Sequence, residues 1–103
     1  MFSNRTPPAL REEIRAKMLA TPEYVRVAAV TSISRLPARD PAETFALPTL
    51  AVLARVPALR AAQMRSIFPK LEIERWENYG HFLMMEDPER FNQTLESFLS
   101  ANP

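Results

Sequence analysis

The chain has 103 residues, of which 47% are hydrophobic, and this length and composition fit one ordinary soluble domain rather than a disordered or fibrous chain. Thirteen basic and twelve acidic residues leave a formal charge of +1 without long blocks of either sign, which argues against nucleic acid and membranes as partners. The absence of cysteine excludes disulfides, a thiolate nucleophile and cysteine metal sites, and it favours the cytoplasm as the compartment.

Two helices are predicted near the N-terminus, where no apolar segment of a secretory signal is present. Thr6-Pro7-Pro8 has the form of a helix start, a hydroxyl cap followed by proline in the first turn, and predicts a helix over about residues 8–20. Thr21-Pro22-Glu23 repeats this signal and predicts a second helix to about residue 34. Its predicted buried stripe consists of Val25, Ala28, Ala29, Ser32 and Ile33. Residues 1–36 are therefore expected to form a helical hairpin.

A linker loop is predicted over residues 37–48, because prolines stand at positions 37, 41 and 48. The following run Thr49–Ala54 is apolar without alternation, which is typical of a strand buried on both faces of a parallel sheet. A helix is also compatible with this run. Residues 57–68 are predicted as a helix that begins on proline, with a buried side formed by Leu59, Met64, Ile67 and Phe68.

The last part of the chain contains a predicted strand, a turn and a helix. Leu71–Trp76 alternates apolar and charged residues, as a half-exposed edge strand does. Asn78-Tyr79-Gly80 turns the chain before His81, and Asp87-Pro88-Glu89 opens a final helix. The apolar stripe of this helix is Phe91, Leu95, Phe98 and Leu99. Residues 49–103 thus form a predicted βαβα unit with a short parallel sheet, and the fold class is α/β.

The segment from Trp76 to Phe91, with its Gly80-His81 pair and the Asp87-Pro88 helix start, resembles the C-terminal end of α/β-hydrolases. Residues 48–53 resemble the penultimate strand of that family, and residues 68–73 resemble the entry to its last strand. The resemblance implies a partial α/β-hydrolase fold in which residues 1–36 are cap-like helices and residues 49–103 belong to the core. It also implies that His81 is the general base of a catalytic triad.

An active hydrolase needs more than the histidine, because a triad also requires a nucleophile and an acid. None of the serines stands in a Gly-x-Ser-x-Gly elbow, since Gly80 is the only glycine. The family's usual position for the acid falls on residues 55–60, which include no carboxylate. Asp40 is the nearest spare aspartate, and an Asp-Pro turn is the simpler interpretation for it. The chain is therefore expected to be inactive alone.

Other chemistry is weakly indicated by the sequence. Glu86 and Asp87 lie close to His81, but one histidine without a second ligand cluster is poor support for a metal, and no cofactor is expected. Asp87 fits a helix N-cap, and Glu86 adds negative charge near the helix start.

Three functional interpretations remain open from the sequence. The first is the C-terminal part of a serine hydrolase that acts on an ester, lactone or carbon–carbon bond, with a small-molecule ester-like substrate only in the complete enzyme. The second is a non-catalytic interaction or assembly module, which self-associates through the apolar edge of the strand at residues 49–54. The third is an independent helical domain, in which residues 49–54 are helical.

Overall fold

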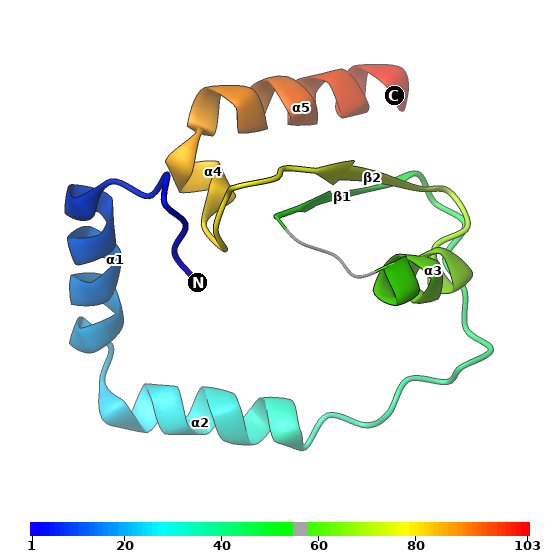
Figure 1. Cartoon of the computed structure of the whole chain (residues 1–103). Coiled ribbons are helices and arrows are strands. Elements are labelled where there is room, and N and C mark those ends of the chain that lie inside the picture. Colours follow the sequence, from blue (N-terminus) through cyan, green and yellow to red (C-terminus); the bar gives the residue numbers. More distant parts are fainter. Residues whose placement is uncertain (55–57) are drawn as a thin grey trace. The chain divides into compact units, whose positions relative to one another are not determined.

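The computed structural model describes residues 1–54 and 58–103, and these residues contain helices and a small sheet (Figure 1). In chain order the elements are α1 (Pro8–Ala20), α2 (Glu23–Ser34), β1 (Thr49–Leu53), α3 (Ala58–Ile67), β2 (Leu71–Arg75), α4 (Leu83–Glu86) and α5 (Pro88–Ala101). They divide into two units. One unit comprises Pro8–Glu43, and the other combines Met1–Pro7 with Thr44–Pro103. The segment 1–7 thus groups with the C-terminal part of the chain, whereas the sequence placed it with the N-terminal helices.

The unit Pro8–Glu43 contains α1 and α2, both close to their predicted bounds. The expected start signal of α2 is wrong in one detail, because the Thr21 hydroxyl donates to the Lys17 carbonyl at 3.2 Å and no side chain caps this helix. The predicted buried stripe of α2 is also wrong, since none of its side chains is buried. The turn at Asp40 is confirmed: its carboxylate accepts from the Ala42 N–H at 2.9 Å.

The other unit is built on two parallel strands, which confirms a mixed α/β arrangement with a short parallel sheet. β1 pairs with β2 in the register Thr49↔Leu71 to Leu53↔Arg75. The helical interpretation of residues 49–54 is therefore wrong. All five residues of β1 are half-buried, and in the described part of the chain its second edge pairs with no strand.

The helix α3, which connects the two strands, buries the predicted side only in part: Met64, Ile67 and Phe68 are half-buried, but Leu59 is not. Leu59 is 73% exposed, whereas Ala61 is buried at 2%. The small side chain of Ala61 lies on the side that meets the rest of the unit, and α3 packs on β2. The prediction that Leu59 belongs to the core is therefore wrong. Residue 57, the predicted first residue of this helix, lies outside the described residues.

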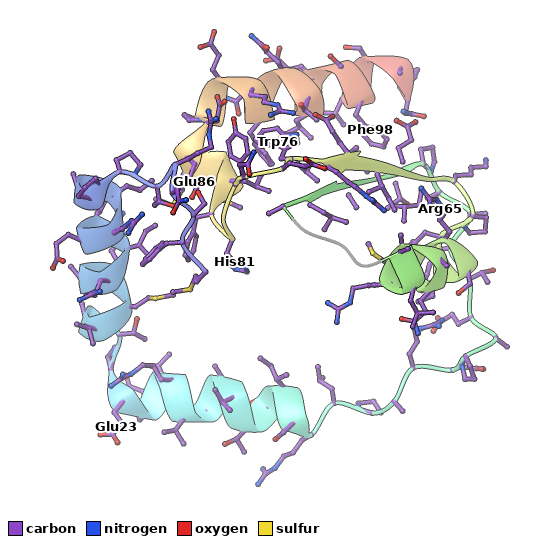
Figure 2. All side chains as sticks on the ribbon, in the orientation of Figure 1. Glu23, Arg65, Trp76, His81, Glu86 and Phe98 are labelled. Carbon is purple, nitrogen blue, oxygen red and sulfur yellow. The ribbon has the colours of Figure 1, made fainter. Side chains whose placement is uncertain are left out.

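The core of this unit gathers around Trp76, which directly follows β2 and is fully buried (Figure 2). Its indole N–H donates to Glu74 at 2.7 Å, and the Arg90 guanidinium lies 4.2 Å from its ring centroid. Tyr79 and Leu83 complete the buried cluster, and Val52, Ala54 and Phe91 pack against it. The apolar stripe of α5 is only partly covered, since Leu95 is 41% and Leu99 56% exposed.

Candidate functional site

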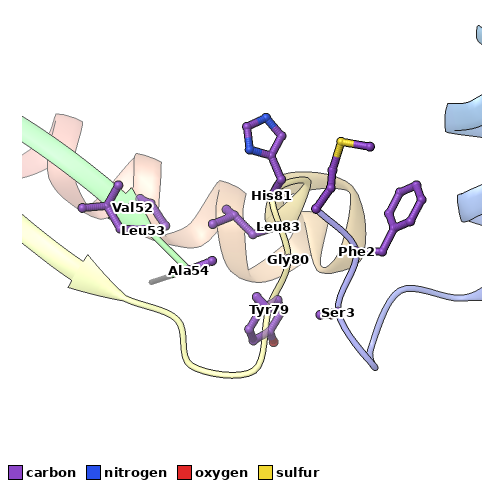
Figure 3. Close-up of a pocket in the computed structure, with 10 residues that line it drawn as sticks. Phe2, Ser3, Val52, Leu53, Ala54, Tyr79, Gly80, His81 and Leu83 are labelled. Atoms are coloured by element: carbon purple, nitrogen blue, oxygen red, sulfur yellow. The ribbon is translucent and has the colours of Figure 1, made fainter. Parts of the chain in front are cut away.

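His81 lies in the loop between β2 and α4, on the border of a cavity of about 540 Å³. The described residues that line this cavity come from the N-terminal residues Met1–Ser3, the end of β1 with Ala54, the loop that carries His81, and Leu83 at the start of α4. Figure 3 shows the imidazole projecting from its loop, with the end of β1 on one side and the N-terminal segment on the other. The histidine is exposed, so its ring is accessible to a ligand.

The turn that leads to His81 depends on Asn78, which has a φ of 67°. This left-handed conformation is uncommon for residues other than glycine, and asparagine tolerates it better than most. The sequence predicted a turn at residues 78–80, and the structure has one at residues 77–78. Gly80, however, does not adopt a positive φ, so its value to the loop has another cause.

Position 80 has no room for a side chain, because the backbone of the N-terminal segment passes close to it. A Cβ atom at this position would lie 2.6 Å from the Met1 carbonyl oxygen and 2.9 Å from both the Ser3 nitrogen and Glu86 Oε1. Contacts under 3.0 Å are essentially never made by real Cβ atoms. Glycine at this position therefore permits a close approach of two backbones.

The N-terminal segment, defined as residues 1–7, is held on the His81 loop by several contacts. The His81 N–H donates to the Met1 carbonyl at 2.7 Å. The Arg5 guanidinium lies 4.5 Å from the centroid of the Tyr79 ring, a cation–π distance. The segment thus forms one wall of the cavity, which the sequence did not predict.

Glu86 accepts hydrogen bonds from both sides of this junction. Its Oε1 atom accepts from the hydroxyls of Ser3, at 3.0 Å, and Thr6, while Oε2 accepts from the Gly80 N–H at 2.9 Å. Burial alone would raise the pKa of Glu86, but the hydrogen bonds from Thr6, Gly80 and Ser3 together outweigh it and hold the pKa below its ordinary value. The carboxylate is therefore the stable form in this site.

The Thr6 hydroxyl, expected as a helix cap, takes part in this network instead of acting only locally. Thr6 is only 2% exposed. Its hydroxyl oxygen accepts a hydrogen bond from the Ser3 N–H at 2.9 Å, and its O–H donates a hydrogen bond to Glu86 Oε1.

Asp87 acts as the predicted N-cap of α5, where its carboxylate accepts from the Arg90 N–H at 3.1 Å. It also accepts from the Tyr79 hydroxyl at 2.9 Å. These two hydrogen bonds, first that of Arg90 and then that of Tyr79, lower the pKa of Asp87. Both carboxylates next to His81 thus serve the loop structure, and the described residues contain no cluster of three or more metal ligands.

A catalytic triad would need a serine nucleophile and an acid beside His81. Ser3 borders the cavity, but its hydroxyl donates to Glu86. The Ser66 hydroxyl donates to the Gln63 carbonyl at 2.6 Å within α3. Residues 55–57, part of the expected position of the acid, lie outside the described residues, and residues 58–60 carry no carboxylate. In the described part of the chain, His81 is thus exposed, and the hydroxyls of Ser3 and Ser66 donate to groups other than its imidazole.

Sequence reasoning missed the N-terminal segment and the role of Glu86. The only signal for either was indirect: the hydroxyls of Ser3 and Thr6 precede a helix, and Glu86 lies before the helix cap Asp87. No pattern in the sequence connects positions 3 and 6 with position 86.

Comparison with known proteins adds no relationship, since no family model, no curated protein and no solved structure matches this chain. The functional interpretation therefore depends on the sequence pattern and on the geometry around His81.

Proposed function

We propose that this chain forms the C-terminal part of a serine α/β-hydrolase, with His81 as the general base and a complementary part that supplies the nucleophile. The position of His81 carries this proposal: it follows β2 and shares a cavity with the C-terminal end of the parallel strand β1. In open α/β sheets, ligands bind outside the carboxyl ends of the strands. A histidine loop at this place suits proton transfer to and from a bound substrate.

In the complete enzyme, His81 takes the proton of the attacking hydroxyl and later returns it to the leaving group. The exposed ring can approach a hydroxyl from outside the chain. Backbone N–H groups of the complementary part stabilise the oxyanion. The contribution of this chain is therefore the base and one side of the substrate site.

The cavity wall favours an uncharged, partly apolar substrate. Phe2, Val52, Leu53 and Leu83 line it, and among the described lining residues no Asp, Glu, Lys or Arg side chain occurs. Apolar walls with few polar groups are typical of small-molecule sites. An ester, a lactone or a substrate for carbon–carbon bond cleavage is compatible with this lining.

The free edge of β1 supports the need for a complementary part. Two-stranded sheets are marginally stable in water, and β1 carries five half-buried apolar or small residues beside its unpaired edge. In the hydrolase interpretation this strand lies inside a larger sheet, and the next strand of the complementary part pairs with it.

An esterase assay on aryl acetates tests the catalytic side of the proposal. The isolated chain is expected to cleave p-nitrophenyl acetate no faster than free imidazole at the same concentration, because its sequence contains no Gly-x-Ser-x-Gly elbow for a serine nucleophile. Turnover above that rate that disappears in His81→Ala would contradict the expected inactivity.

Ligand binding tests the substrate site without catalysis. Acetanilide is a neutral, slowly hydrolysed analogue of phenyl acetate, and His81 is the only histidine, so its ring protons give unambiguous NMR signals. We expect acetanilide to shift these signals in a saturable manner, without a change in Trp76 fluorescence. Unshifted ring signals up to the solubility limit of acetanilide would contradict the proposed site.

A second candidate function, a non-catalytic assembly module, is favoured by the same unpaired edge of β1. Exposed edges accept an added strand from another chain. Size-exclusion chromatography with light scattering separates the two candidates: self-association that Val52→Lys abolishes supports the module, and a monomer at all concentrations argues against it.

The amino-acid composition suggests a compartment and argues against some classes of partner. We propose the cytoplasm, because the chain contains no cysteine. No helix in the described part of the chain has both the length and the apolar character needed to cross a bilayer. The nearly balanced charge argues against nucleic acid as a partner.

A further inference from the structure

The carboxylate of Glu86 connects segments that lie at opposite ends of the sequence. Its Oε1 atom binds Ser3 and Thr6, which are 83 and 80 residues away, and its Oε2 atom binds the backbone of Gly80. Gly80 directly precedes His81, whose own N–H donates to Met1. One carboxylate thus joins the N-terminal segment and the His81 loop at the place where they contact each other.

We propose that Glu86 is the positioning residue of His81. By holding the N-terminal segment on the Gly80–His81 loop, Glu86 fixes the loop and keeps in place the cavity wall that the segment forms. The inference rests on the proposed function only in treating His81 as a base, since the junction itself is a structural arrangement. Glu86 is not a catalytic residue, because it acts through the loop.

The chemistry of the junction requires an acceptor with two oxygens. Thr6 and Gly80 are both buried, and their donors need partners at that position. An ionised carboxylate only accepts, and its two oxygens serve several donors at once. A carboxamide retains one acceptor oxygen and introduces two N–H donors, so Glu86→Gln keeps the shape but leaves at least one of these buried donors without its bond.

The role of Glu86 is separate from helix capping. Asp87 caps α5, whereas Glu86 is the last residue of α4 and its carboxylate accepts hydrogen bonds from residues outside both helices. The charged and titratable groups around the junction include Arg5 and the Met1 amino group on the N-terminal segment, His81 and Tyr79 on the loop, and Asp87 and Arg90 at the start of α5. Loss of Glu86 should therefore loosen the loop without removing the cap of α5.

Hydrogen exchange measured on the full chain tests this role. In Glu86→Ala and Glu86→Gln, the Gly80 and His81 amides are expected to exchange roughly tenfold faster or more, as loss of a hydrogen bond to a charged group predicts. The His81 ring signals shift in the same variants. Glu96→Gln, a matched change at an exposed residue of α5, is expected to alter neither property.

Two further readouts separate a local effect from general unfolding. Trp76 is the only tryptophan and lies in the core, so unchanged fluorescence shows that the core stays intact. Thr6→Val keeps the shape of a buried side chain but removes the hydroxyl, and it should accelerate His81 exchange less than Glu86→Ala. Combined with Glu86→Ala, Thr6→Val should add less acceleration than it causes alone, because its bond to Glu86 is already lost and only the bond from the Ser3 N–H is lost anew.

Exchange of Gly80 and His81 within about twofold of the unmodified chain in Glu86→Ala, with an intact core, would overturn the proposal. Loss of the Trp76 core in Glu86→Gln as well as in Glu86→Ala would also overturn it, because Glu86 would then support the whole unit and not the loop. These outcomes do not depend on hydrolysis. If the ester and ligand tests contradicted the hydrolase proposal, the exchange result would still stand. If the exchange result contradicted the role of Glu86, the hydrolase proposal would still stand.

Discussion

The substitution Gly80→Ala tests the contact between the N-terminal segment and the His81 loop. The added methyl group would lie 2.6 Å from the Met1 carbonyl oxygen, whereas ordinary contacts begin at 3.4 Å. The carbonyl must therefore move by about 0.8 Å, the difference between these two distances. A shift of this size also strains the 2.7 Å hydrogen bond from the His81 N–H to the same oxygen.

Overpacking of this kind typically costs about 1–3 kcal/mol. We expect Gly80→Ala to lower the free energy of unfolding within that range and to accelerate exchange of the His81 amide. Urea unfolding followed by Trp76 fluorescence gives the first quantity, and hydrogen exchange followed by NMR gives the second. Because the buried core of the unit is small, a loss of this size should be visible as a clear shift of the urea midpoint.

Ser100→Ala is the control for Gly80→Ala, because Ser100 is exposed at the end of α5 and should change stability by about 0.5 kcal/mol or less. A Gly80→Ala chain with the urea midpoint and the His81 exchange rate of the unmodified protein would refute the close approach of the two backbones.

Three further predictions follow from the same loop. Asn78→Gly should leave stability unchanged or raise it by up to about 1 kcal/mol in urea unfolding, since glycine adopts the φ of 67° without strain, and Asn78→Val should lower it. His81→Ala should change the free energy of unfolding by no more than about 0.5 kcal/mol, because the side chain is exposed, and a larger loss in urea unfolding would show a structural role. The pKa values of Glu86 and Asp87 lie below their ordinary values of 4.5 and 3.8, so both carboxylates stabilise the fold above about pH 4.5 and lose this effect as the pH falls through their lowered pKa values. Glu86→Gln should therefore flatten the decrease of the urea midpoint below that pH, and an unaltered slope would contradict the hydrogen bonds of Glu86.

The order of helices and strands was largely predictable because local signals define each element. Proline marks the first helical position of α1 and α5, and Asp87 provides the cap of α5. The apolar run at residues 49–53 and the alternation at residues 71–75 identified the two strands of the sheet. These signals require no knowledge of distant contacts.

The burial of individual side chains was less predictable, because it depends on which face of a helix meets a neighbour. Leu59 is more apolar than Ala61, yet the alanine is buried and the leucine is exposed. The stripe of α2 has a suitable period, but none of its side chains is buried. Periodicity identifies a possible buried face, and packing decides whether it is used.

The candidate site was predictable only in its centre. His81 and the turn before it follow from local sequence, whereas the wall formed by Met1–Ser3 depends on contacts across about eighty positions of the chain, such as that of Ser3 with Glu86. From the sequence, Glu86 was expected only to add negative charge near the start of the last helix. Its actual partners follow from the close approach at Gly80, which no local pattern encodes.

The most direct measurement of the proposed function is the coding sequence upstream of the Met1 codon. We expect an open reading frame whose product contains an apolar strand followed by Gly-x-Ser-x-Gly, which would supply the missing nucleophile. An upstream region without such a segment in any continuous frame would contradict the assignment of His81 as the base of a serine hydrolase.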